Sequence, residues 1–171
     1  MAKIDTKIIS ESGKKELLIK IKLNAPRNLV WKAWTDPEMF KQWWGPKDFT
    51  TPVARMDLKE GSEYFSCMRS SDGQNFCSKG VYLEIVPPKQ LVMTDSFADK
   101  DGNKVAPINY GFNENFPMEM QIKVTLEDEG DNTKLTLKCS DINNINEAEL
   151  NDMKQGWNES LDKLAEFVSK S

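Results

Sequence analysis

The sequence offers few side chains that can do acid–base or nucleophilic chemistry. It contains no histidine, which removes the commonest general base near neutral pH and excludes Ser–His and Cys–His nucleophile pairs. Two carboxylates, Glu84 and Asp95, lie in otherwise apolar strand patterns. If either points into a cavity, burial would raise its pKa and make it a candidate acid or base, and Tyr82, on the same strand face as Glu84, could offer a hydroxyl to a ligand. The alternatives are that the carboxylates face solvent or pair with Arg69, and that Tyr82 packs structurally.

Metal and phosphate sites are not indicated by the sequence. The segment Asp99–Asn103 resembles the start of a calcium-binding loop, but Lys104 and Tyr110 stand where that loop requires glycine and a bidentate acid. The cysteine spacings match no zinc pattern, and glycine-rich phosphate loops are absent from the sequence. We therefore expect no metal, no cofactor and no defined set of catalytic residues.

Aromatic and methionine side chains are the remaining candidates for a binding function. Indole rings combine a large apolar surface with one donor, and methionine is flexible and polarizable, so both suit adaptable pockets. The alternative is ordinary core packing, and the four tryptophans between Trp31 and Trp44 could also wedge short helices onto a sheet or form an interface. The predicted cavity wall consists of Trp44, Phe65, Tyr82, Met93, Met118, Met120, Met153, Trp157 and Leu161, with Glu84 and Asp95 as its candidate polar groups.

A long amphipathic helix is predicted near the C-terminus, over residues 147–168. Apolar side chains recur there at steps of three and four, and polar side chains occupy the opposite face. Its start is marked by Asn144 or Asn146, each followed by a glutamate three residues later, which is the pattern of a capping box. We expect the apolar stripe to pack on a sheet, although it could dock on a partner. Gly156 would cost this helix roughly 1 kcal/mol relative to alanine, so we interpret it as a point of close packing.

The other elements predict an α+β fold with one curved antiparallel sheet of about six to seven strands around the long C-terminal helix. Period-two alternation indicates the strands, and turns such as Ser71–Gln74 join neighbouring strands into hairpins. Two short helices are expected after the first strand, beginning at Pro26 and Pro37, with Asp36 as the cap of the second. The expected strands are residues 17–23, 53–58, 62–69, 76–86, 90–96, 118–126 and 133–140.

Length, charge and composition limit the function classes. The chain of 171 residues fits a single domain over residues 15–171, preceded by a polar, flexible segment over residues 1–14. A net charge of −4 and a pI near 5.1 argue against nucleic-acid binding, which needs a positive surface. No apolar signal segment and no run of about 18 apolar residues is visible in the sequence, so we expect a cytoplasmic protein without a membrane span.

Three cysteines, Cys67, Cys77 and Cys139, are expected to be reduced thiols in such a compartment. Cys67 and Cys77 are equidistant from Asp72 at the tip of a predicted hairpin, so they are expected to face each other across it. A disulfide between them is the alternative.

Several motifs, in one order along the chain, resemble a known family. Over about residues 15–168 the chain is similar to the activator of heat-shock-protein (Hsp90) ATPase homologue 1-like family, in the START-like or SRPBCC (Bet v 1-like) superfamily. The matching stretches are Ala25–Arg27, Val30–Pro37, Trp43–Pro46, Phe49–Val53, Met68–Ser70 with Asp72–Gly73, Gly80–Tyr82 with Glu84–Pro88, Thr94–Asp99, and Gln155–Asn158 with Leu161–Leu164.

The resemblance implies a helix-grip fold with a hydrophobic cavity between sheet and helix, and it implies no shared reaction. It favours a non-enzymatic START-like domain that binds an apolar small molecule, either aromatic and polyketide-like or lipid-like. Two alternatives stay open: an interaction protein that acts on a chaperone in a stress response, and a cyclase- or hydrolase-type enzyme using Glu84 or Asp95 with Tyr82. Similar sequences often carry histidine where Asn109 stands before Tyr110, so no role of that histidine applies here.

Overall fold

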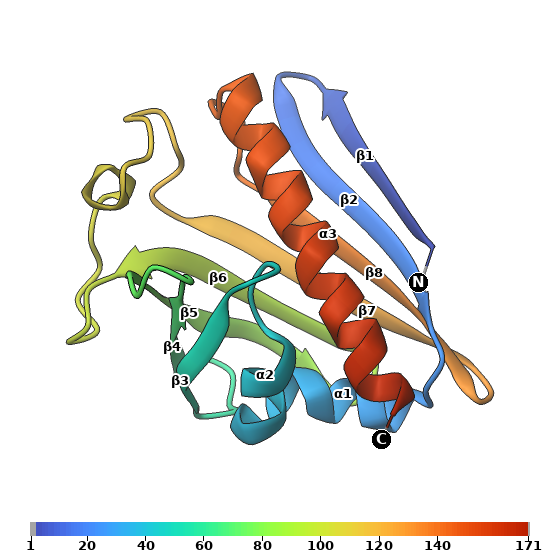
Figure 1. Cartoon of the computed structure of the whole chain (residues 1–171). Coiled ribbons are helices and arrows are strands. Elements are labelled where there is room, and N and C mark those ends of the chain that lie inside the picture. Colours follow the sequence, from blue (N-terminus) through green and yellow to red (C-terminus); the bar gives the residue numbers. More distant parts are fainter. Residues whose placement is uncertain (1–2, 171) are drawn as a thin grey trace.

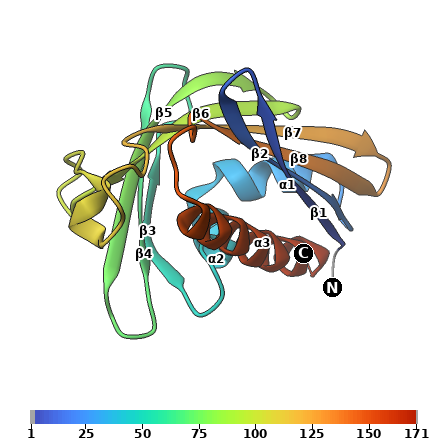
Figure 2. The same cartoon turned by 90° about the horizontal axis from the view of Figure 1, so that it is seen from above.

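The computed structural model describes residues 3–170, and it is built around one eight-stranded antiparallel sheet. The strand order is β1-β2-β8-β7-β6-β5-β4-β3, so the pairing of β2 with β8 joins the two ends of the chain. Figures 1 and 2 show the sheet curving around the long helix α3, with the short helices α1 and α2 at one end. The strands are β1 (Ile4–Glu11), β2 (Lys14–Leu23), β3 (Thr50–Met56), β4 (Glu63–Arg69), β5 (Asn75–Val86), β6 (Gln90–Ala98), β7 (Met120–Glu129) and β8 (Asn132–Ser140), and the helices are α1 (Arg27–Thr35), α2 (Pro37–Trp43), the 3-10 turn η1 (Pro107–Tyr110) and α3 (Glu147–Ser169).

The helix α3 lies across the concave face of the sheet, as the apolar stripe predicts. Leu161, Leu164 and Val168 are buried in the main core, together with the inward side chains of β2, β7 and β8. Asn146 is its N-cap, because the Asn146 side chain accepts a hydrogen bond of 2.7 Å from the Glu149 backbone N–H. The second of the two predicted starts is therefore the one used.

The short helices α1 and α2 pack against one end of the sheet. Asp36 caps α2 by accepting hydrogen bonds from the backbone N–H groups of Glu38 and Met39, at 2.9 and 3.4 Å. Trp34 and Trp43 are fully buried between the helices and the sheet, and the Trp43 indole donates to a carbonyl of α1 at 2.9 Å. These two tryptophans are core residues, and Trp44 remains for the cavity.

The N-terminal segment differs from the expectation of a flexible stretch over residues 1–14. Residues 4–11 form the edge strand β1, paired in register with β2, and residues 1 and 2 lie outside the described residues. Ile4 and Ile8 pack against the core, and the Thr6 hydroxyl donates to the Asn158 side chain of α3 at 2.9 Å. The sequence gives a weak signal here because an edge strand has one solvated face and few large apolar residues. This strand raises the count from the expected six or seven to eight.

The cysteines correct a second expectation. Cys67 of β4 and Cys77 of β5 are directly opposite in register, with Cα atoms 4.0 Å apart, and their sulfurs form a disulfide. The predicted hairpin geometry is confirmed, but the expectation that both thiols are reduced is wrong for this pair. Cys139 is a buried free thiol in β8, and burial raises its pKa to about 12.

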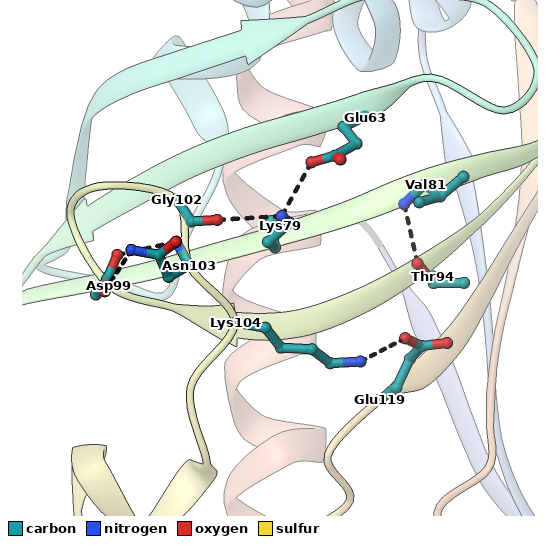
Figure 3. Close-up of polar contacts among 9 residues, drawn as sticks. All are labelled: Glu63, Lys79, Val81, Thr94, Asp99, Gly102, Asn103, Lys104 and Glu119. Carbon is teal, nitrogen blue, oxygen red and sulfur yellow. Dashed lines mark hydrogen bonds and ion pairs between the residues drawn. The ribbon is translucent and has the colours of Figure 1, made fainter.

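The long connection between β6 and β7, residues 99–119, is attached to the neighbouring strand β5 and closed on itself by polar contacts (Figure 3). Lys79 of β5 forms an ion pair with Glu63 at 3.0 Å and donates to the Gly102 carbonyl at 3.1 Å. Lys104 forms an ion pair with Glu119 at 2.8 Å, which joins the two ends of the connection. The segment between these anchors can therefore form a wall beside the sheet. In the described part of the chain, no helix combines the length and hydrophobicity that crossing a membrane requires.

Candidate functional site

A pocket of about 410 Å³ lies between α3 and the half of the sheet made by β4 to β7. Four parts of the chain line it: α3 from Glu149 to Ser160, residues 44–49 after α2, the inner face of the strands, and residues 112–116 of the long connection. It therefore occupies the space between sheet and helix that a helix-grip fold creates.

Aromatic rings make up two walls of this pocket. On the wall beside α2, Trp44 contacts Trp157 of α3 edge to face, with centroids 5.3 Å apart, and stacks on Phe40 at 4.6 Å. On the opposite wall, the phenylalanine cluster consists of Phe97, Phe112 and Phe116, with centroid distances of 4.7 to 5.8 Å. Rings in such offset or edge contacts attract each other beyond the area they bury, so both walls are preformed.

Asp95 is the one of the two predicted carboxylates that lines the pocket. The Tyr64 hydroxyl lies 2.6 Å from the Thr94 carbonyl and 3.0 Å from Asp95 Oδ1. A hydroxyl has one proton, so when Tyr64 donates to Thr94 it can accept a hydrogen bond from a protonated Asp95. Burial raises the pKa of Asp95 to about 7, although the Tyr64 hydrogen bond opposes that shift. Burial and the neighbouring Asp95 also raise the pKa of Tyr64 well above its usual value.

Gly80 makes room for this pair. A Cβ atom at Gly80 would lie 1.9 Å from the Thr94 carbonyl oxygen and 2.5 Å from the Tyr64 ring. The strand β5 therefore needs glycine at this position for Tyr64 to pack across it and reach Asp95.

Glu149 is the polar group at the start of α3. Its Oε2 atom accepts a hydrogen bond of 2.8 Å from the backbone N–H of Asn113, which attaches the long connection to the helix. Its Oε1 atom is buried and has no hydrogen-bond partner among the described residues. An unpaired buried carboxylate oxygen costs stability, so a positive charge placed beside this group would be stabilising.

Gly156 lies on the pocket side of α3. A Cβ atom there would meet a single heavy-atom neighbour within 4 Å, Pro46 Cγ at 3.7 Å, which is an ordinary contact. The interpretation of Gly156 as a point of close packing is therefore wrong. The glycine instead leaves space on the face of the helix that lines the pocket.

The predicted wall residues divide into two groups. Trp44, Met120, Met153 and Trp157 line the pocket, as does Asp95. The others do not line it, for reasons that differ from one residue to the next.

Three of those others belong to the packed interior. Tyr82 of β5 and Met93 of β6 are directly opposite each other and are buried in the core. Leu161, on the sheet-facing side of α3, is fully buried. Tyr82 contacts the Tyr64 ring, with centroids 5.6 Å apart, so burial raises its pKa but its hydroxyl does not line the pocket.

The remaining three face away from the pocket. The Arg55 guanidinium lies over the Phe65 ring, with its carbon Cζ 4.7 Å from the Phe65 ring centroid. The Met118 side chain is 47% exposed. Glu84 follows an irregularity in the pairing of β5 with β6 and accepts a hydrogen bond of 2.5 Å from Gln90.

Several pocket residues escaped the sequence prediction. Phe112 and Phe116 lie in a polar connection where no periodicity assigns a face, and Phe97 lies at the end of β6. A signal was available, because aromatic residues concentrated in a long polar connection are more typical of a binding loop than of a solvated one.

A second depression, of about 820 Å³, lies near the C-terminal half of α3. Its lining is largely charged and partly or fully exposed, with Lys22, Lys47, Lys163, Glu159 and Glu166 among its residues. Ligand sites are mostly apolar and concave with few polar groups, so the aromatic pocket is the candidate site. Within residues 3–170, no cluster of three or more His, Cys, Asp or Glu side chains has a geometry that could hold a metal ion.

A curved antiparallel sheet around a C-terminal helix, with two short helices after its first strands, defines a helix-grip domain of the START-like class. The family model described as "Activator of Hsp90 ATPase homolog 1-like protein" matches residues 24–169. The chain belongs to that family, and the fold predicted from the sequence is confirmed. A comparison with curated proteins gave no match.

Solved structures of similar proteins have the same fold. A protein from Arthrobacter aurescens is 20% identical, with a TM-score of 0.80 and coverage of 96% of this chain and 92% of that one. Protein NE0264 from Nitrosomonas europaea is 25% identical, with a TM-score of 0.74 and coverage of 94% and 97%. The AHSA1 protein from Silicibacter pomeroyi is 22% identical, with a TM-score of 0.69 and coverage of 88% and 94%.

Proposed function

We propose that this chain is a binding module for an apolar, ring-containing small molecule held in the aromatic pocket. The observation that carries the proposal is the pair of preformed aromatic walls around a space of about 410 Å³. Small-molecule sites typically enclose 300–1,000 Å³ and combine apolar walls with few polar groups. Each square ångström of apolar surface that a ligand buries there contributes about 25 cal/mol.

The size of the pocket favours compact ring systems over long chains. Ring systems bring little conformational entropy to lose on binding, whereas an extended acyl chain must be immobilised along its length. Among the ligand classes that the sequence allows, flat aromatic molecules therefore fit better than fatty acids.

Two measurements test the proposal. Native mass spectrometry of freshly purified protein should show a bound ligand mass. Quenching of tryptophan fluorescence by a neutral ring compound such as phenanthrene should saturate, because Trp44 and Trp157 lie in the wall.

The matched variants are Gly156→Leu and Gln155→Leu. Gly156 lines the pocket and a leucine there fills part of it, whereas Gln155 is exposed on the adjacent helix position outside the lining. Gly156→Leu should weaken phenanthrene binding at least tenfold, and Gln155→Leu should leave it unchanged. Equal binding by both variants, or no saturable binding by the native chain, would refute the proposal.

Proton transfer to a bound ligand is a second candidate function. What supports it is Asp95, a carboxyl group inside the pocket whose pKa is raised to about 7. Its partner would be Tyr64 rather than the Tyr82 expected from the sequence. The test is to incubate the ligand recovered by mass spectrometry with native protein and with the Asp95→Asn variant. Conversion by the native protein alone, followed by NMR so that a change of isomer is also seen, would support this candidate, and an unchanged NMR spectrum of the ligand would exclude it.

The chaperone partner that gives the family its name is kept as an alternative with a separate assay. Exposed apolar side chains of the described chain, such as Leu83 and Ile108, would be part of a docking surface. A pull-down with the host's Hsp90-type chaperone should recover this chain if that alternative holds, and failure to recover it would remove it.

A further inference from the structure

The acidic residues that line the aromatic pocket are Asp95, Glu149 and Asp152, and the described residues that line the pocket include no lysine or arginine. Because burial raises the pKa of Asp95 to about 7, the negative charge of the lining comes mainly from the carboxylates of Glu149 and Asp152. Neither of these two takes part in an ion pair found among residues 3–170. Their negative charge is therefore not compensated by an ion pair within the described part of the protein.

The basic side chains near the pocket already have partners. Lys104 pairs with Glu119, and Lys79 pairs with Glu63 (Figure 3). Lys163 of α3 lines the second depression and not this pocket, and its Nζ atom donates to the Phe49 carbonyl at 3.1 Å and to two other carbonyls of the segment after α2. A positive charge that enters the pocket would meet carboxylates without a competing cation in the lining.

A second observation concerns the charge of Glu149. The Oε1 atom of Glu149 is buried without a hydrogen-bond partner among the described residues, while Oε2 of the same group accepts from the Asn113 N–H. Buried polar atoms are nearly always hydrogen-bonded in folded proteins. The carboxylate of Glu149 is therefore only partly stabilised by the protein, and a positive charge in the pocket beside it would be favourable.

The ring faces add to the attraction for a cation. Trp44 and Trp157 on one side and the phenylalanine cluster on the other surround the space with negatively charged π faces. Aromatic enclosures of this kind recognise ammonium groups through cation–π contact, most strongly where the site is desolvated.

We infer that the pocket selects apolar ligands that carry an amine or other cationic nitrogen, and disfavours carboxylates and other anions of the same shape. This inference rests on the proposed function, because it names the chemical class of the ligand for the same pocket. The ammonium group would lie beside the carboxylates of Glu149 and Asp152, while its ring system packs between the aromatic walls.

Three probes with one ring system test the inference. 1-Naphthylmethylamine carries a positive charge at pH 7, 1-ethylnaphthalene is neutral, and 1-naphthylacetate is negative. Each is titrated into the full chain at low salt, where unscreened charges act most strongly, and binding is followed by tryptophan fluorescence. We expect the amine to bind about tenfold or more tightly than the acetate, a range consistent with one desolvated cation–π and carboxylate contact.

The outcomes separate the two proposals. Equal affinities for the three probes, or tighter binding of the acetate, would overturn the inference while leaving the pocket as a binding site. Binding by none of them would refute the proposed function and this inference together.

Matched variants assign the preference to one carboxylate. Glu149→Gln keeps an oxygen for Asn113 but removes the charge, whereas Glu147→Gln makes the same change two residues earlier in α3, at an exposed site outside the pocket. The readout is the ratio of amine to ethylnaphthalene affinity within each variant, which cancels any general effect on folding. Glu149→Gln should reduce that ratio several-fold and Glu147→Gln should not. An unchanged ratio in Glu149→Gln would overturn the assignment of Glu149.

Discussion

Replacing Gly156 by alanine should stabilise the protein, because this glycine lies in the interior of its longest helix. Glycine inside a helix costs about 0.5–1 kcal/mol relative to alanine, because it loses more backbone entropy on folding. The added methyl group would contact Pro46 Cγ at 3.7 Å and has no closer neighbour among the described residues. No steric cost therefore offsets the gain, and the free energy of unfolding should rise by about 0.5–1 kcal/mol.

For a chain of this length, each kcal/mol shifts the Tm by about 2–4 °C, so Gly156→Ala should raise the Tm by about 1–4 °C. The assay is thermal unfolding followed by circular dichroism, with calorimetry as a second probe of two-state behaviour. The same substitution at Gly80 is the contrasting control. Its Cβ would lie 1.9 Å from a carbonyl oxygen, so Gly80→Ala should lower the Tm strongly.

A fall in the Tm of Gly156→Ala would refute the reasoning, since it would mean that the helix packs more closely there than the structure shows. A rise, by contrast, would mean that the native chain keeps a residue that is worse for stability than alanine. Such residues are typical of functional sites, and here the glycine widens the pocket.

Three further predictions concern other parts of the structure. Lys163→Met should lower the free energy of unfolding by about 1–3 kcal/mol, because the half-buried Lys163 ammonium donates to the Phe49 carbonyl and to two other carbonyls. Unfolding in urea measures this, and an unchanged urea midpoint would contradict the prediction. Between about pH 4 and pH 7, stability should fall as the pH rises and then level off, because folded Asp95 keeps its proton up to about pH 7 while the unfolded chain loses it near pH 4. Asp95→Asn should flatten that part of the profile, and a profile that keeps its slope would assign it to another group. The Cys67–Cys77 disulfide closes a loop of sequence separation 10, so its reduction should lower the free energy of unfolding by about 2–3 kcal/mol. The measurement is a lower Tm in the presence of reductant. A Cys67→Ser, Cys77→Ser variant should show no such effect of reductant on its Tm.

The pH prediction depends on which groups face Asp95. Tyr64 of β4 contacts it directly, the Cys139 thiol of β8 interacts with it through space, and Glu149 and Asp152 of α3 line the same pocket. Burial raises the pKa of both Tyr64 and Cys139, so neither ionises below pH 9. The change between pH 4 and pH 7 is therefore expected to come from Asp95.

Elements with a strong period were predictable from the sequence. The stripe from Leu150 to Val168 gave α3, and the alternation in β2, β7 and β8 gave the buried half of the sheet. The edge strand β1 was missed because its residues alternate between exposed and half-buried, with only Ile4 and Ile8 packed against the core. Period alone does not separate such a strand from a polar loop.

The pocket was only partly predictable, because a strand pattern does not say which face is inner. In β4, the adjacent rings of Tyr64 and Phe65 point to opposite faces, and Tyr64 is the one that points inward. In β5, the irregularity between Tyr82 and Glu84 changes the alternation, so the two residues do not share the expected site. Residues 112–116 belong to an irregular connection, whose position depends on contacts far away in the sequence.

Glu149 links the position of that connection to the chemistry of the pocket. One oxygen of its carboxylate holds the Asn113 N–H and so keeps Phe112 and Phe116 against the sheet, while the other oxygen is buried at the pocket. A cation in the pocket beside Glu149 would compensate the carboxylate charge without competing for the oxygen that holds Asn113. If the proposed function holds, the wall and the ligand would therefore depend on one side chain, and a cationic ligand would reduce the cost of leaving the second oxygen buried without a partner.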